Sequence, residues 1–228
     1  MNTQQRDQEH RSQRQDPHAG QPVVTAGPAV EEAAGAIVMI HGRGASAESI
    51  LDLYPVLGVE SLAALAPQAA GHTWYPQSFL APLEANQPYL DSALGKIDAV
   101  VEELLANGMK AERVALLGFS QGACLASEYV ARHPRRYGAV MALTGGLIGP
   151  PGTKRDYAGS LAGTPVFLGT SDPDPHVPME RVKETGEVLA RMGATVEVRR
   201  YPGMPHTINQ EELDACRALL GAMVGQAR

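Results

Sequence analysis

The stretch Gly118-Phe119-Ser120-Gln121-Gly122 places a serine between two glycines, where an apolar run meets a helix-compatible segment. A strand that turns directly into a helix crowds the backbone, and residues without a Cβ fit beside the tip of such a turn. Ser120 is therefore expected to project its hydroxyl from the turn, with the N–H of Gln121 at the helix N-terminus, where negative charge is favoured. The pattern is typical of a nucleophilic serine. The alternative is an ordinary strand–turn–helix in which the serine only caps the helix.

A serine hydroxyl is a poor nucleophile unless a histidine takes its proton and an acid orients that histidine. His206 lies in a loop rich in glycine and proline and is the expected base, although it could instead cap the last helix. Two candidate acids, Asp172 and Asp174, share another loop, and their positions after the preceding strand favour neither. Together with His176 they form a D-x-D-x-H sequence, but this has no established zinc spacing, so we expect no metal.

Acyl transfer also requires two N–H donors for the oxyanion of the tetrahedral intermediate. The backbone N–H of Gln121 is one candidate. The second is the backbone N–H of Arg43, in the glycine-rich turn that follows the first predicted strand. His41 opens this turn at the end of that strand, and we interpret it as a structural histidine.

The elements that position these residues alternate along the chain. Apolar runs predict strands at 36–40, 62–66, 114–117, 139–143, 165–168 and 195–200, and helices are predicted at 46–57, 89–106, 123–132, 179–192 and 210–224. Strands that are apolar throughout and separated by helices indicate a parallel sheet covered on both faces, a single doubly wound α/β domain. Its ligands are expected beyond the carboxyl ends of the strands, where the serine, acid and histidine loops all lie.

Composition and charge argue against two classes of protein, those that bind nucleic acids and those that span a membrane. The net charge is −6 and the folded part carries no basic cluster, so we expect no nucleic-acid partner. No apolar run is long enough for a membrane span, and no secretory signal is apparent at the N-terminus, which favours a cytoplasmic protein. Residues 1–34 contain few large apolar residues and are predicted to form a disordered tail before a catalytic domain at 35–228. Cys124 and Cys216 are expected to be buried free thiols.

Four motifs carry a resemblance to a known family. They are His41-Gly42-x-Gly44, Gly118-Phe119-Ser120-Gln121-Gly122, Asp174-Pro175-x-Val177-Pro178 and Pro202-Gly203-Met204-x-His206. In this order, and over roughly residues 36–224, they resemble the phospholipase/carboxylesterase family of α/β-hydrolases, which includes acyl-protein thioesterases. The resemblance implies that Asp174 is the catalytic acid, that the fold has no large lid, that no cofactor is used, and that Trp74 lies near the acyl pocket.

Arg43 departs from the thioesterase members, which usually carry an apolar residue there. Its guanidinium is expected to point to solvent, the alternative being a contact with a substrate carboxylate. Few apolar residues are available to line a pocket: Trp74, Tyr75, Phe79 and Leu147. We therefore expect a small or medium acyl group.

The sequence thus predicts a serine carboxylesterase that forms an acyl-enzyme on Ser120, which His206 and Asp174 activate, and that acts on a small-molecule ester. A thioesterase or lysophospholipase would use the same residues, and an inactive member of the fold would serve as a binding protein. Monomer and homodimer remain equal alternatives.

Overall fold

The computed structural model describes residues 16–225, which form a seven-stranded sheet in the order β1-β3-β2-β4-β5-β6-β7. β1 is antiparallel to β3, and the other neighbouring pairs are parallel. The strands are β1 (Val23–Ala26), β2 (Gly35–Ile40), β3 (Leu62–Pro67), β4 (Val114–Phe119), β5 (Ala139–Leu143), β6 (Pro165–Asp172) and β7 (Thr195–Pro202). The predicted doubly wound α/β architecture is confirmed.

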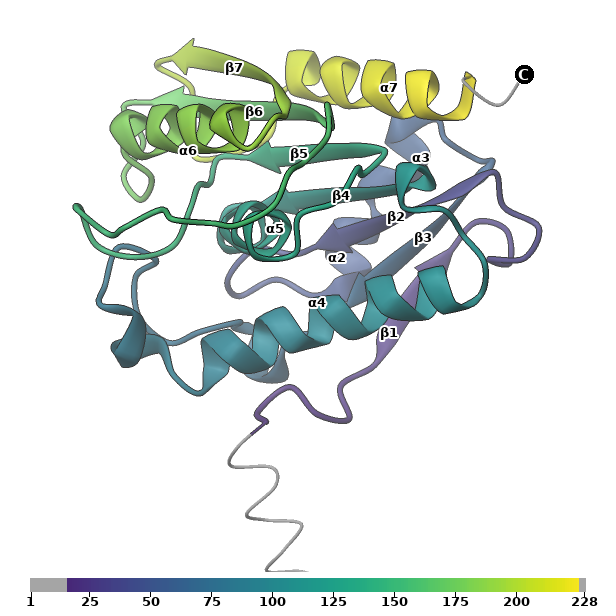
Figure 1. The fold of residues 1–228 in the computed structure, drawn as a ribbon, viewed down its shortest axis with the longest axis horizontal. Helices are drawn as coiled ribbons and strands as arrows, with labels where there is room; N and C mark the ends of the chain where they lie inside the picture. The colour runs from purple at the N-terminus through teal and green to yellow at the C-terminus, as the bar shows by residue number, and fades with distance from the viewer. Residues whose placement is uncertain (1–15, 226–228) are drawn as a thin grey trace, which may run out of the picture.

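Helices cover both faces of this sheet (Figure 1). One face carries α4 (Tyr89–Ala106), α5 (Gln121–Arg132) and α6 (Met179–Arg191), and the other carries α2 (Ala47–Leu51), α3 (Leu53–Leu57) and α7 (Gln210–Gly225). In the described part of the chain there are also three short 3₁₀ helices: η1 (Ala70–His72), η2 (Leu83–Asn86) and η3 (Ala111–Arg113). Within residues 16–225, no helix has the length and apolar character needed to cross a bilayer.

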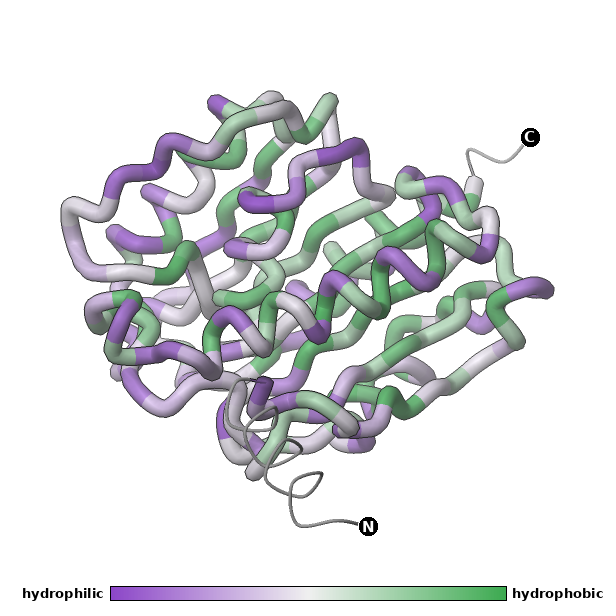
Figure 2. Tube along the Cα trace, turned by 60° about the horizontal axis from the view of Figure 1, so that its bottom comes forward, coloured by the Kyte–Doolittle hydropathy of each residue, from purple (hydrophilic) through white to green (hydrophobic). Residues whose placement is uncertain are grey.

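Strands β2 to β6 are largely apolar because both of their faces are buried, whereas the edge strands β1 and β7 have no buried residue. Along β2, Val38 and Ile40 pack toward α4 and α5, while Ile37 and Met39 pack toward α2 and α7, and all four side chains are inaccessible to solvent. Figure 2 shows that hydrophobic stretches gather on the inner strands and that hydrophilic residues lie on outer turns and loops. This burial holds the sheet rigid beneath the loops at its carboxyl edge.

The prediction of a single helix at 46–57 is wrong, since the structure has two short helices that meet at Asp52. Ser46 does cap the first helix, accepting a hydrogen bond from the N–H of Ser49 at 3.3 Å. Pro55 explains the break, because proline has no N–H to donate to Leu51 four residues earlier.

The predicted disordered tail is wrong for residues 16–34. β1 pairs with β3, and His18 is fully buried, so this segment belongs to the domain. Composition missed it because an edge strand is held mainly by backbone hydrogen bonds, which do not require large apolar side chains. Residues 1–15, the rest of the predicted tail, lie outside the described residues.

Candidate active site

Ser120 occupies a strained turn between β4 and α5, with φ 54° and ψ −117°. Two close approaches explain the flanking glycines. A Cβ on Gly118 would lie 2.2 Å from the carbonyl oxygen of Gly122, and a Cβ on Gly122 would lie 2.0 Å from that of Ile40. The turn is therefore compatible only with glycine at both positions.

His206 lies between the serine and an acid. Its Nε2 is 2.9 Å from Oγ of Ser120, and its Nδ1 is 2.8 Å from Oδ2 of Asp174. A carboxylate can only accept at Nδ1, so this nitrogen carries the proton and Nε2 is free to accept the hydroxyl proton of Ser120. The three side chains thus have the hydrogen-bond order that nucleophilic activation of a serine requires.

The side chain of Asp174 is buried and richly hydrogen-bonded. Oδ2 also accepts from Oγ of Ser171 at 2.5 Å, and Oδ1 accepts from the N–H groups of His176 and Val177, both at 2.8 Å. Burial by itself raises the pKa of Asp174, but the hydrogen bonds from Ser171 and His206 and from the two amides hold that pKa below its ordinary value. The carboxyl is consequently ionised and suited to orienting an imidazole.

The other candidate acid has a different environment. β6 extends to Asp172, which is its last residue, and the Asp172 carboxylate forms an ion pair with Arg200 on β7 at 3.2 Å. Of the two acids, only Asp174, which lies beyond the end of the strand, contacts His206.

The two proposed oxyanion donors lie beside the nucleophile. Gln121 is the first residue of α5, where a backbone N–H has no partner within the helix. The turn that contains Arg43 approaches from β2, and a Cβ built on Gly42 would lie 3.5 Å from Cβ of Ser120. Both amides are therefore within the same corner of the site.

The side chains of these same two residues hold one loop. Gln121 accepts from the N–H of Trp74 and donates to the carbonyl of Tyr75, both at 2.9 Å. Arg43 donates to the carbonyls of Tyr75 at 2.9 Å, Pro76 at 3.0 Å and Gln77 at 2.7 Å. The expectation that the guanidinium simply points to solvent is thus wrong. It lies at the surface but folds back onto the loop, because backbone carbonyls satisfy its donors.

A cavity of about 730 Å³ opens beside the Ser120 hydroxyl. It is lined by the loops at 75–80 and 174–178, with Tyr75, Phe79 and Cys124 among the lining residues. Burial raises the pKa of the Cys124 thiol to about 12, so this thiol is uncharged and contributes apolar surface.

Trp74 and Leu147, also expected in the pocket wall, are instead fully buried in the core behind it. The indole N–H of Trp74 donates to the carbonyl of His41 at 2.9 Å, which turns the ring inward. Tyr75 is also buried, at 1% exposure, but it is among the residues that line the cavity, whereas Trp74 is not.

His41 is a buried, neutral structural histidine. Its Nε2 accepts from the N–H of Ala69 at 3.1 Å, and its Nδ1 donates to the carbonyl of Gly42 at 2.7 Å. Burial lowers the pKa of His41, so the ring remains uncharged.

His18 and Ser171 also contribute to the site, although no sequence motif pointed to them. Nε2 of His18 lies 2.8 Å from the carbonyl of Trp74, and its Nδ1 accepts from the N–H of Ala70 at 3.0 Å, which holds the pocket loop from behind. Ser171 supports Asp174 from within β6. No local pattern marks either residue, since both act on partners that the fold supplies.

A family model described as Phospholipase/Carboxylesterase matches residues 21–223. The crystal structure of a phospholipase/carboxylesterase from Dyadobacter fermentans DSM 18053 is 46% identical, with a TM-score of 0.85, over 88% of this chain and 96% of that chain.

Curated relatives are more distant. Acyl-protein thioesterase 1 of Debaryomyces hansenii is 26% identical over 216 residues, which cover 84% of this chain and 92% of the relative. A probable carboxylesterase, SOBER1-like, of Arabidopsis thaliana is 29% identical over 136 residues, and the match spans about half of that relative, 52% of its length. The family model covers most of this chain, so the chain belongs to the phospholipase/carboxylesterase family of α/β-hydrolases.

Proposed function

We propose that this protein is a serine carboxylesterase that hydrolyses esters of small to medium acyl groups through an acyl-enzyme on Ser120. One observation carries the proposal: the imidazole of His206 bridges Ser120 and Asp174, with hydrogen-bond distances of 2.9 and 2.8 Å. This is the geometry in which a histidine takes a proton from serine and is stabilised as a cation by the acid.

In the first half of the proposed reaction, Nε2 of His206 takes the hydroxyl proton while Oγ of Ser120 attacks the ester carbonyl carbon. The oxyanion of the tetrahedral intermediate accepts hydrogen bonds from the backbone N–H groups of Gln121 and Arg43. His206 then gives its proton to the leaving alcohol oxygen as the C–O bond breaks, which leaves the acyl group on Ser120.

In the second half, His206 takes a proton from water as the water oxygen attacks the acyl carbon. The second tetrahedral intermediate uses the same two N–H donors. It collapses with transfer of the proton from His206 to Oγ of Ser120, which releases the carboxylic acid and restores the free enzyme.

The cavity supports the proposed acyl size. Tyr75, Phe79 and Val177 line it, and the loop that carries the first two residues is held by Arg43 and Gln121. A wall fixed in this way favours acyl groups that fit the existing space over long flexible chains.

The test is release of p-nitrophenol from acetate, butyrate and octanoate esters, by the full chain and by Ser120→Ala, with a chelator present. We expect turnover by the wild type and a loss of about a thousandfold or more in kcat in the variant. Equal activity of the two proteins would show that Ser120 is not the nucleophile. An inactive wild type would instead favour a binding role for the fold.

Thioester hydrolysis is a second candidate because relatives named acyl-protein thioesterase match this chain. It is distinguished by comparing kcat/KM for an oxyester and a thioester of the same acyl group. A preference of more than about tenfold for the thioester, after correction for the intrinsic reactivity of the two esters, would replace the carboxylesterase assignment.

A further inference from the structure

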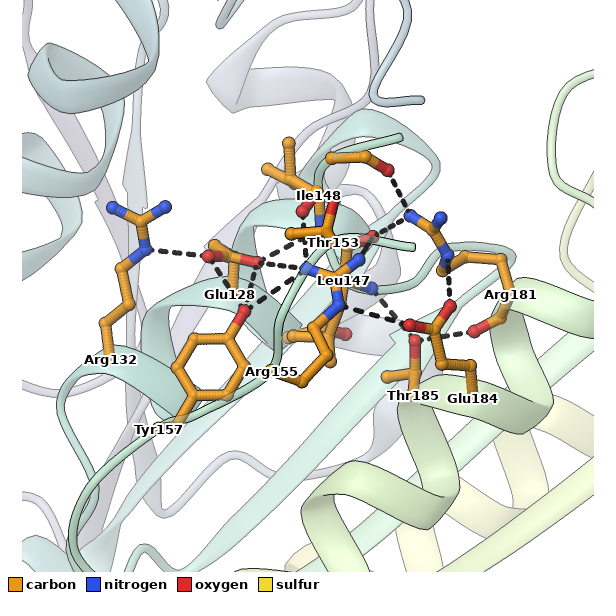
Figure 3. A network of polar contacts seen from close by, with 12 residues as sticks. Glu128, Arg132, Leu147, Ile148, Thr153, Arg155, Tyr157, Arg181, Glu184 and Thr185 are labelled. Atoms are coloured by element: carbon orange, nitrogen blue, oxygen red, sulfur yellow. Dashed lines mark hydrogen bonds and ion pairs between the residues drawn. The ribbon is translucent and has the colours of Figure 1, made fainter. Parts of the chain in front are cut away.

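A cluster of buried charges lies beside the site and has no part in the proposed reaction. The cluster contains Glu128 on α5, Arg155 in the loop that precedes β6, and Arg181 on α6 (Figure 3). Their side chains are 2, 5 and 4% exposed, respectively. Glu184 forms ion pairs with Nε of Arg155 at 3.2 Å and with Nε of Arg181 at 2.8 Å. Taking several charges out of water is costly, so such a cluster contributes little net stability. Its hydrogen bonds to the backbone point to another role.

These bonds converge on the segment 147–149, which follows β5. Arg181 donates through Nη1 to the carbonyls of Leu147 at 2.7 Å and Gly149 at 2.6 Å, and Arg155 donates to that of Ile148 at 2.6 Å. Glu128 accepts from the N–H of Ile148 at 3.0 Å. Figure 3 shows the two arginines reaching this segment from its two sides. The segment is thus held through its backbone, independently of its side chains.

The held segment is in turn bonded to the wall of the cavity. The N–H of Gly149 donates to the carbonyl of Phe79 at 2.7 Å. In addition, the Arg181 guanidinium carbon lies 5.8 Å from the centroid of the Phe79 ring, within the range of a cation–π contact. Phe79 is 7% exposed and lines the cavity. Arg181 therefore contacts Phe79 by two routes, one through Gly149 and one through the ring.

We infer that Arg181 is a positioning residue that sets the acyl-group selectivity of the site by fixing Phe79 in the cavity wall. This inference rests on the proposed ester hydrolysis for its kinetic consequences, but its structural part is independent of any activity. Arg181 does not reach Ser120 or His206 and acts only through Phe79. A guanidinium suits this task because its planar fork bonds two carbonyls while its face packs on an aromatic ring.

Loss of Arg181 frees Phe79 and widens the cavity. We expect Arg181→Met to change the ratio of kcat/KM for octanoate to that for acetate by at least about tenfold in favour of octanoate, the scale of discrimination that a pocket wall gives. The value of kcat for acetate is expected to change by less than about threefold, since the reacting groups are untouched. Arg181→Lys keeps the charge without the fork and should shift the ratio by a smaller amount.

Arg132→Met is the matched control. Arg132 pairs with Glu128 in the same cluster at 2.7 Å, but it is 32% exposed and bonds the carboxylate of Glu128 rather than the 147–149 backbone. Its removal should leave the acyl ratio within about twofold of the wild type. Phe79→Leu should mimic Arg181→Met, and the double variant should shift the ratio no further than Phe79→Leu alone, because one residue acts through the other.

Amide hydrogen exchange tests the contact between Arg181 and Phe79 without any measurement of enzymatic activity. Hydrogen exchange at the Gly149 N–H, which bonds Phe79, is expected to accelerate at least about tenfold in Arg181→Met and to stay unchanged in Arg132→Met. Any one of three results would overturn the inference. These are an unchanged exchange rate at Gly149 in Arg181→Met, an unchanged ratio of kcat/KM in a folded and active Arg181→Met, and additive shifts of that ratio in the double variant. If Arg181→Met does not fold, Arg181→Lys decides by the same measurements. An inactive wild type would count against the proposed function. In that case the exchange rate at the Gly149 N–H alone would test whether Arg181 positions Phe79.

Discussion

Oδ2 of Asp174 lies 2.8 Å from Nδ1 of His206, whereas Asp172, only two residues earlier, is paired with Arg200 on the neighbouring strand. The difference arises because β6 continues through Asp172 and ends there. The next residues turn away from the sheet, and two amides of that turn bind the other oxygen of Asp174. The backbone thereby selects which of two nearby acids meets the imidazole.

This relationship predicts that two similar substitutions, at Asp174 and at Asp172, differ greatly in their effect on kcat. Asp174→Asn is expected to lower kcat for p-nitrophenyl acetate by roughly 10⁴-fold, because an amide N–H facing Nδ1 favours the wrong imidazole tautomer. Asp172→Asn, the matched control, removes only a partly exposed ion pair and should leave kcat within about threefold. Steady-state kinetics at neutral pH measures both. A comparable loss in the two variants would refute the assignment of Asp174.

A second prediction concerns the Arg43 side chain. Arg43→Met removes three hydrogen bonds to the loop at 75–77 but keeps the backbone N–H of residue 43. We expect KM for butyrate to rise about tenfold or more, as expected for losing charged hydrogen bonds, with a smaller change in kcat. Arg217→Met, at a surface pair on α7, serves as the control. A fall confined to kcat would indicate that the guanidinium acts on the reacting group instead.

The tight turn around Ser120 predicts a large loss of stability for Gly122→Ala. The new Cβ would lie 2.0 Å from the carbonyl oxygen of Ile40, and the next nearest atoms are also backbone, of Ile40 and His41, so no flexible side chain can move away. We expect the free energy of unfolding to fall by about 3 kcal/mol or more. Gly221→Ala in α7 meets nothing within 4 Å and should raise that free energy by about 0.5 to 1 kcal/mol. Urea denaturation of both variants tests the contrast.

Glu212, at the start of α7, predicts a dependence of stability on pH. Burial raises the pKa of this carboxyl from 4.5 to about 7, despite a hydrogen bond from the N–H of Asn209. The folded state thus binds the proton more tightly than the unfolded chain. The contribution of Glu212 to the free energy of unfolding is complete below pH 4.5 and is lost as the pH rises to about 7, by up to about 1.4 kcal/mol per pH unit.

Glu212→Gln should remove this component. Urea denaturation at several pH values between about 5 and 8 is expected to give a flatter profile for Glu212→Gln than for the wild type. Its exposed neighbour supplies the control, since Glu211→Gln should preserve the wild-type slope. Parallel profiles for all three proteins would show that Glu212 does not titrate in this range.

His18 predicts that the N-terminal segment stabilises the pocket loop. His18→Ala removes the bonds to the carbonyl of Trp74 and the N–H of Ala70, together with an edge contact to the Trp74 ring. We expect a loss of about 2 kcal/mol in the free energy of unfolding and faster amide exchange at Ala70. Gln21→Ala keeps the backbone carbonyl that accepts from Lys96 and should cause little change. Similar behaviour of the two variants would contradict the role assigned to His18.

Features that depend on local sequence were predictable. Sequence runs located six of the seven strands in residues 16–225, and five of these, β2 to β6, are largely apolar because both of their faces are buried. The glycines beside Ser120 revealed the turn, since the crowding is produced by neighbouring backbone. The edge strand β1 and the division between α2 and α3 escaped this reasoning, because one depends on pairing with a distant strand and the other on a single missing N–H.

The residue types at the carboxyl edge of the sheet follow from the order of strands and loops along the chain: a serine, a histidine and two acids. Their partners at that edge are chosen by the tertiary structure. It brought Asp174 rather than Asp172 to His206, buried Trp74 in the core, and folded Arg43 onto the loop that it holds. The reason is physical: hydrogen-bond partners separated by tens of residues are chosen by strand register and by the burial of particular side chains, neither of which a local pattern encodes.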